Sequence, residues 1–171
     1  MKMITNWQDV PFEKYIEISK LYFELDDLSN AINLVSILSD KSVEDIDKIK
    51  AKDFTKYSSN LQFLETEPDF KTSKYKWKIK SIEDITVDDF IAFENLKDEN
   101  FNYPAILSFM SENNLDEDNI NEMSAIDVLA GFFLLNKKLQ RYTITTLLSL
   151  ILKAMREKIQ KLAFWRRNQM K

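Results

Sequence analysis

The sequence predicts a mainly α protein: a compact multi-helix domain with one small β-strand or hairpin at about residues 70–85 and a long basic amphipathic C-terminal helix. One observation is that Gly131 is the only glycine among 171 residues, because scarce glycine disfavours tight hairpins. Another is that apolar residues recur at steps of three or four along most of the chain, which is the period of a helix. From 74 to 80, however, lysines alternate with aromatic or aliphatic residues, which is the period of a half-buried strand.

Short helices in tandem are predicted for the N-terminal half. Apolar residues at helical spacing indicate helices over 12–24 and 28–38. Ser42 is expected to cap a brief third helix, because acidic residues follow it in the first turn. Asp53 begins a fourth helix, which is expected to end before Pro68.

The strand predicted at 74–80 requires a partner. Residues 69–72 or 81–85 would make a small hairpin with it, and the edge of another copy is the third alternative. Its lysines together with Tyr75 and Trp77 suggest a platform for nucleic acid, on which bases stack between phosphate-binding lysines. Strict alternation puts the aromatic residues on the face opposite the lysines, so packing of Tyr75 and Trp77 in the core is the favoured interpretation.

Helices are predicted again after the strand. Thr86 precedes acidic residues and is expected to cap one helix, and Pro104 helps to start the next. Residues 113–121 are acidic and polar and are predicted to form a loop. Ser124 is expected to cap a helix that is apolar nearly all round and therefore central to the core.

The C-terminal third carries the longest helical signal. An apolar stripe at steps of three or four is formed by Ile144, Leu147, Leu148, Ile151, Met155, Ile159, Leu162 and Trp165. From Lys137 onward there are ten basic residues and one acidic residue, whereas the preceding 136 residues contain 14 basic and 27 acidic ones. We therefore divide the chain into an acidic helical body with a small β insertion, 1–136, and a basic amphipathic C-terminal helix, 137–171, within the same domain.

Three interpretations of the basic C-terminal helix are open. It packs its apolar stripe on the acidic body, it docks on a partner protein or another copy, or it binds nucleic acid or an anionic membrane. The candidate anion-binding residues are Lys153, Arg156, Lys161, Arg166 and Arg167. Packing and protein docking are favoured over nucleic acid and membrane.

The composition disfavours an enzyme. The chain has no cysteine and no histidine, which excludes disulfides, thiolate nucleophiles, imidazole catalysis and zinc sites with Cys or His ligands. Acidic pairs such as Asp26/Asp27 and Asp88/Asp89 are interpreted as helix caps and not as a metal site. We therefore predict no catalytic residue, no metal and no cofactor. The first residues do not have the pattern of a signal peptide and no apolar run is long enough to span a bilayer, so a cytoplasmic protein is expected.

Patterns in a fixed order cover most of the chain. They are Met3-Ile4-Thr5 before Trp7, Val10 and Phe12; Ser42-Val43-Glu44-Asp45-Ile46 and Phe63-Leu64; Tyr75-Lys76-Trp77 before Ile85-Thr86-Val87-Asp88-Asp89-Phe90; Asn102 to Phe109; and Val128-Leu129-Ala130-Gly131-Phe132-Phe133. In this order they resemble small tailed-bacteriophage proteins of the tail-assembly-chaperone type. The resemblance implies a mainly helical, non-enzymatic protein that coats the tape-measure protein until tail-tube subunits replace it.

The resemblance carries over no catalytic residue. The candidate partner-binding residues are Phe132 and Phe133 from the matched patterns and, from the C-terminal stripe, Ile144, Leu148, Ile151, Met155, Ile159, Leu162 and Trp165. The expected partner is a phage structural protein such as the tape-measure protein, bound as a helix in an apolar groove, and a homo-oligomer is a second expectation. The expected location is the host cytoplasm, with or without retention in the virion. The long basic tail departs from the family's pattern, which leaves room for a different virion or assembly role. The alternative function is a nucleic-acid-binding accessory protein that uses the basic C-terminal helix.

Overall fold

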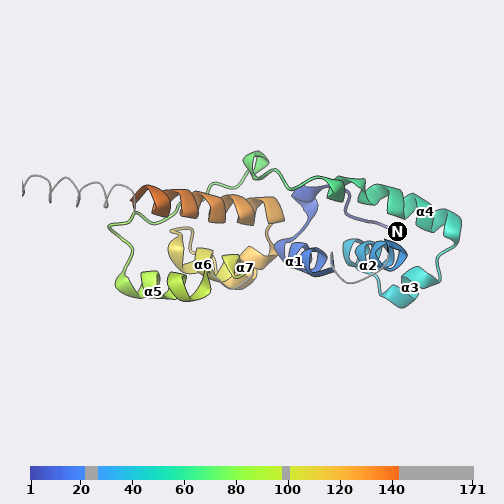
Figure 1. Ribbon diagram of the computed structural model, residues 1–171, viewed down its shortest axis with the longest axis horizontal. Coiled ribbons are helices and arrows are strands. Elements are labelled where there is room, and N and C mark those ends of the chain that lie inside the picture. Colours follow the sequence, from blue (N-terminus) through green and yellow to red (C-terminus); the bar gives the residue numbers. More distant parts are fainter. Residues whose placement is uncertain (22–26, 98–100, 143–171) are drawn as a thin grey trace, which may run out of the picture. The chain divides into compact units, whose positions relative to one another are not determined.

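The structure, a computed structural model, describes residues 1–21, 27–97 and 101–142, and these residues are mainly helical. The chain divides into two compact units, Met1–Phe133 and Leu134–Lys171. In chain order the elements are η1 (Trp7–Asp9), α1 (Phe12–Leu21), α2 (Asp27–Ser39), α3 (Val43–Asp47), α4 (Ala51–Ser59), η2 (Asn60–Glu65), η3 (Phe70–Thr72), α5 (Val87–Leu96), α6 (Tyr103–Met110) and α7 (Glu117–Glu122), where η denotes a 3-10 helix (Figure 1). Residues 125–142 form a further helix, drawn orange in Figure 1.

Aromatic side chains link the first unit together. Ring contacts run from Phe63 in η2 through Trp7 and Tyr15 to Phe12 in α1, with ring centroids 5.3 to 6.0 Å apart. A second series of contacts joins Phe12 to Tyr103 in α6 at 5.8 Å and Tyr103 to Phe132 at 4.1 Å. Edge and stacked ring pairs of this kind each stabilise a core by about 0.5–1.5 kcal/mol beyond the area that they bury.

Tyr103 is a partly buried titratable group of this series. Burial raises the pKa of its phenol above the ordinary value, and the nearby Tyr15 raises it further. The Tyr103 phenol therefore stays neutral to a higher pH than an exposed tyrosine does.

Contacts between distant segments place the remaining helices. The backbone N–H of Phe12 donates to the carbonyl of Met123 at 2.8 Å, and that of Ala125 donates to Val10 at 2.8 Å. These bonds join the start of α1 to the start of the 125–142 helix. In addition, α6 contacts both α5 and α7, and α1 contacts both α2 and α7 (Figure 1).

Two of the helix starts occur where the sequence predicts them. Ser42 caps α3, and its hydroxyl accepts from the N–H of Asp45 at 3.2 Å. Thr86 caps α5 in a reciprocal arrangement, because Asp89 N–H donates to the Thr86 hydroxyl at 3.0 Å and Thr86 N–H donates to the Asp89 carboxylate at 3.1 Å. Each cap satisfies backbone N–H groups that a helix start otherwise leaves unpaired.

The prediction of a loop over 113–121 is wrong for its second half, because Glu117–Glu122 forms α7. Asp116 caps this helix by accepting from Asn119 N–H at 2.8 Å, and Ile120 is fully buried. The acidic residues that suggested a solvated loop are therefore the cap and the first turn of a short helix, where carboxylates are favourable.

The small strand or hairpin predicted at about 70–85 is wrong. Among the described residues there is no strand, and the 73–80 segment forms one isolated antiparallel bridge, between Ile79 and Ser111. Residues 70–72 form η3, so they do not pair with this segment either. The alternation itself is correct, because residues 75, 77 and 79 face inward while lysines 74, 76 and 78 are exposed.

Side chains pair with the backbone over the first part of this extended segment, and the backbone of residues 110–112 pairs with its end, where Lys80 N–H donates to the Met110 carbonyl at 3.0 Å. The Asp127 carboxylate accepts from the backbone N–H groups of Lys74 and Tyr75, and the Asn113 amide oxygen accepts from that of Lys78 at 2.8 Å. An alternating sequence predicts which side chains face inward, but the backbone partners come from elsewhere in the fold.

The long basic C-terminal helix predicted over 137–171 falls mostly outside the described residues. Residues 137–142 are helical as part of the 125–142 helix, which continues through Asn136 without a break. The remainder, 143–171, is not among the residues that the structure describes.

Asp89 both closes the α5 cap and forms an ion pair with Lys80, whose ammonium lies 3.1 Å away. Burial by itself would raise the pKa of this carboxyl, but hydrogen bonds from Thr86 and Lys80 outweigh burial and hold the pKa below its ordinary value. The stabilisation that the ionised Asp89 carboxylate gives the folded state is therefore complete above the pKa of an unfolded aspartate, about 4. It is lost as the pH falls through the lower pKa of the folded state.

We expect Asp89→Asn to lower the free energy of unfolding at pH 7 by about 1–2 kcal/mol, because it removes a cap and a charged hydrogen bond. The difference from wild type should shrink as the pH falls below about 4, since the native carboxylate is then protonated as well. Urea unfolding at several pH values measures both effects. Asp88→Asn, at an exposed position in the same helical turn, is the control and should lower the free energy of unfolding by less. If the loss of stability in Asp89→Asn were the same at every pH, the role assigned to the ionised Asp89 carboxylate would be contradicted.

Candidate functional site

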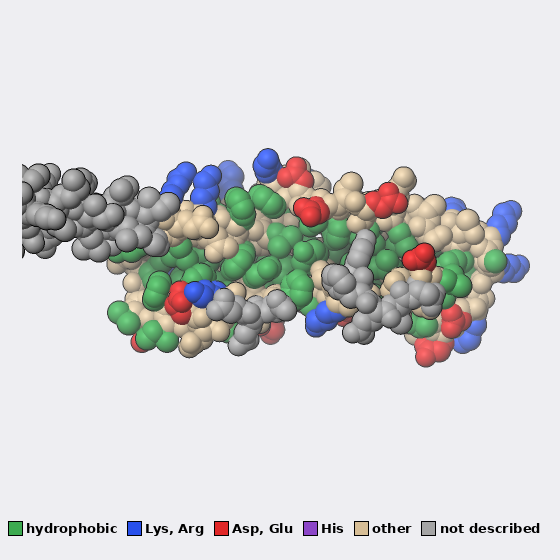
Figure 2. Space-filling view, in the orientation of Figure 1, with side chains coloured by type: hydrophobic (Ala, Val, Ile, Leu, Met, Phe, Trp, Pro, Cys, Tyr) green, Lys and Arg blue, Asp and Glu red, His purple; other side chains and the backbone are tan. Residues whose placement is uncertain are grey.

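Helix α5 exposes three large apolar side chains. Val87 is 75% exposed, Phe90 50% and Ile91 51%. They are spaced three and four residues apart, so they share one side of the helix, which we call the α5 face. In Figure 2 hydrophobic side chains lie exposed at the lower left, where Figure 1 places α5.

The opposite side of α5 is also apolar. Phe93 is buried and Leu96 is partly buried. A surface helix ordinarily has one apolar side and one polar side, and α5 has apolar residues on both. This arrangement is typical of a helix that is covered on two sides when the protein performs its function.

The α5 face is presented on a well-anchored helix. The Thr86–Asp89 cap fixes its start, and the Lys97 N–H donates to the Phe93 carbonyl at 2.9 Å at its end. The Lys80–Asp89 ion pair joins the first turn to the extended segment. The three apolar side chains therefore need little further ordering before they can contact a partner.

The two aromatic residues nominated for partner contact occupy different environments. Phe132 stacks on Tyr103, with an interplanar angle of 21°, and so contributes to the aromatic core. Phe133 is 52% exposed, and its ring lies 4.6 Å from that of Phe70. Adjacent residues on a helix point about 100° apart, so the pair is not presented on one surface.

The other nominated residues lie outside the described part of the chain. They are the partner-binding candidates Ile144, Leu148, Ile151, Met155, Ile159, Leu162 and Trp165, and the anion-binding candidates Lys153, Arg156, Lys161, Arg166 and Arg167.

The sequence analysis did not nominate the α5 face, although a signal was present. The sequence predicts a helix that contains Phe90, Ile91 and Phe93, without saying which sides they occupy. At 100° per residue, however, Ile91 and Phe93 are about 200° apart, so they cannot share a side. That spacing indicates a helix with apolar residues on both sides.

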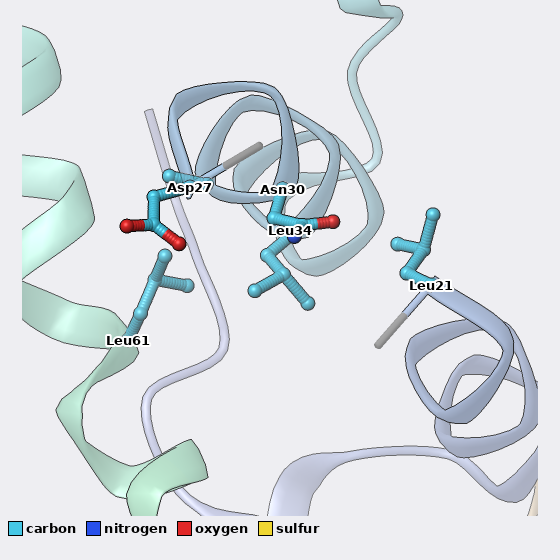
Figure 3. A pocket seen from close by; sticks show the side chains of 6 residues that line it. Leu21, Asp27, Asn30, Leu34 and Leu61 are labelled. Atoms are coloured by element: carbon cyan, nitrogen blue, oxygen red, sulfur yellow. The ribbon is translucent and has the colours of Figure 1, made fainter. Parts of the chain in front are cut away.

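A cavity of about 230 Å³ lies between α1, α2 and η2 (Figure 3). Leu21, Leu34 and Leu61 line it from these three elements, and Asp27 and Asn30 supply its polar groups. We assign no ligand to this cavity, because residues 22–26, which connect Leu21 to Asp27, are outside the described residues.

Within the ranges 1–21, 27–97 and 101–142, no group of three or more acidic side chains is placed to hold a metal ion. Nor does any helix of those ranges have the length and apolar character needed to cross a membrane.

No protein-family model, no curated protein and no solved structure matches this chain. The resemblance to tail assembly chaperones therefore stays a prediction from the sequence.

Proposed function

We propose that this chain is a non-enzymatic phage assembly or structural protein that acts by protein–protein contact, as a tail assembly chaperone for the tape-measure protein. The observation that supports this proposal is the α5 face, with Val87, Phe90 and Ile91 each at least half exposed. An apolar strip of this kind suits the apolar side of an amphipathic partner helix. In this proposal the protein acts in the host cytoplasm, with or without retention in the virion.

The size of the α5 face is compatible with a reversible contact. Burying a large apolar side chain contributes about 1.5–3 kcal/mol, and these side chains are already partly covered. Three of them contribute about 3–5 kcal/mol before the cost of association, which corresponds to weak binding. Many copies bound along one long helical client would hold it by multivalency, and each copy could still be displaced.

We expect Phe90→Asp to abolish capture of the client, because it places a charge in the middle of the apolar contact. The measurement is affinity capture of tagged protein from infected host lysate, with and without nuclease, followed by mass spectrometry. Wild type should enrich one long helical phage protein in both samples. Thr55→Asp, at an exposed position in the middle of α4, adds the same charge elsewhere and should capture the client normally.

Two results would contradict this function. One is equal capture by wild type and Phe90→Asp, provided that both variants unfold at similar temperatures. The other is recovery of a mixed set of proteins that disappears with nuclease, which would favour the alternative of a nucleic-acid-binding accessory protein.

A further inference from the structure

Acidic residues border the α5 face. Asp88 and Glu94 are both exposed, and each lies three residues from Ile91, so each is a neighbour of the apolar strip. Between 81 and 97 there are five acidic residues and one basic residue, Lys97, which is paired with Glu94 at 2.7 Å. An apolar face within an acidic border favours an occupant that is both apolar and basic.

The chain itself contains a sequence with these two properties. In residues 144–167 basic residues, among them Arg156 and Lys161, lie beside the apolar stripe at the helical spacing that the sequence predicts. Residues 132–171 contain neither glycine nor proline, the residues that favour tight chain reversals.

We propose that the 144–167 segment of one copy binds the α5 face of a second copy, and that the second copy's segment binds the first in return. Such a reciprocal exchange gives a closed two-fold dimer in which both contacts are identical. It covers the exposed Val87, Phe90 and Ile91, and it places the basic segment against the acidic border. The inference uses the same α5 face as the proposed function but requires no client, so a client helix would have to displace the segment.

The test is sedimentation equilibrium of the purified full-length chain without any client. Wild type is expected to be a dimer, and Phe90→Asp and Ile151→Asp should each raise its dissociation constant at least about 100-fold, because each buries a charge in both contacts. Mixing these two variants in equal amounts should restore association. In the mixed dimer, one α5 face with Phe90 meets one segment with Ile151, so one contact is intact.

Thr55→Asp is the control for added charge and should dimerise as wild type does. A charge exchange gives a second, independent readout. Asp88→Lys with Glu94→Lys should weaken the dimer, and adding Arg156→Glu with Lys161→Glu should recover at least about tenfold of the loss. A monomeric wild type, or variants that fail to complement on mixing, would overturn the exchange. Capture of the client by a monomeric chain would overturn the dimer and leave the proposed function intact.

Discussion

Replacing Gly131 by alanine is expected to destabilise the protein by about 2–4 kcal/mol, although the same change inside a helix ordinarily stabilises by about 1 kcal/mol. Gly131 is buried in the 125–142 helix, and no glycine has a positive φ angle. Its lack of a side chain matters because a Cβ atom there would lie 2.6 Å from Cε2 and 2.7 Å from Nε1 of Trp77. Real Cβ atoms do not approach other atoms so closely, so the indole ring would have to move.

The Trp77 indole is not free to move without a cost. Its Nε1–H donates to the carbonyl of Asp127 at 2.7 Å, one turn before Gly131 in the same helix. A shifted ring loses this bond and its packing against the helix, which is why we expect overpacking and a lost hydrogen bond together.

A double-mutant cycle isolates the contact. In a Trp77→Val background the space above Gly131 is open, so Gly131→Ala should be neutral or stabilising by up to about 1 kcal/mol. The measurement is the free energy of unfolding in urea for the four variants. An equal loss from Gly131→Ala in both backgrounds would show that the indole is not the obstacle.

The role of Gly131 could not be predicted from the sequence, and the reason is physical. The helical period around it and the inward direction of Trp77 are local properties, and both are correct. That one lies against the other depends on the position of a segment more than 50 residues away along the chain. Local patterns predict which way a side chain faces and do not predict what it meets.

The same distinction explains the corrections to the fold. The Ser42 and Thr86 caps are predictable because a cap needs only residues within the next three positions. The strand at 74–80 is wrong because pairing is a long-range property. Here the side chains of Asp127 and Asn113 and the short backbone segment 110–112 supply the partners.

The candidate site is predictable to a similar extent. The sequence shows that α5 is rich in apolar residues, but not which of them the neighbouring helices leave uncovered. Helix α5 contacts α6, and of its apolar side chains Phe93 is buried whereas Phe90 and Ile91 are half exposed. Exposure depends on the position of a second element, so the α5 face became visible only in the structure.

Asp127→Ala is expected to lower the free energy of unfolding by about 2–3 kcal/mol, because one carboxylate oxygen holds the start of the extended segment. Asp127 Oδ1 accepts from the Ser73 hydroxyl at 2.6 Å and from the N–H groups of Lys74 and Tyr75 at 3.2 and 3.3 Å. Removing a charged acceptor leaves several donors without a partner, which costs more than the net value of any one bond. Asp127→Asn keeps an acceptor oxygen and should lose about half as much.

Which backbone amides lose protection from exchange distinguishes a carboxylate that fixes only the extended segment from one that stabilises the whole fold. Asn113 holds the other end, where its amide oxygen accepts from Lys78 N–H at 2.8 Å and its amide nitrogen donates to the Tyr75 hydroxyl at 3.0 Å. In native-state hydrogen exchange, Asp127→Ala should therefore expose the amides of Lys74 and Tyr75 first, whereas Asn113→Ala should expose that of Lys78. Asp118→Ala, at an exposed position in the first turn of α7, should leave all three protected. Uniform loss of protection along the chain in Asp127→Ala would mean that the carboxylate stabilises the fold as a whole and does not fix this segment in particular.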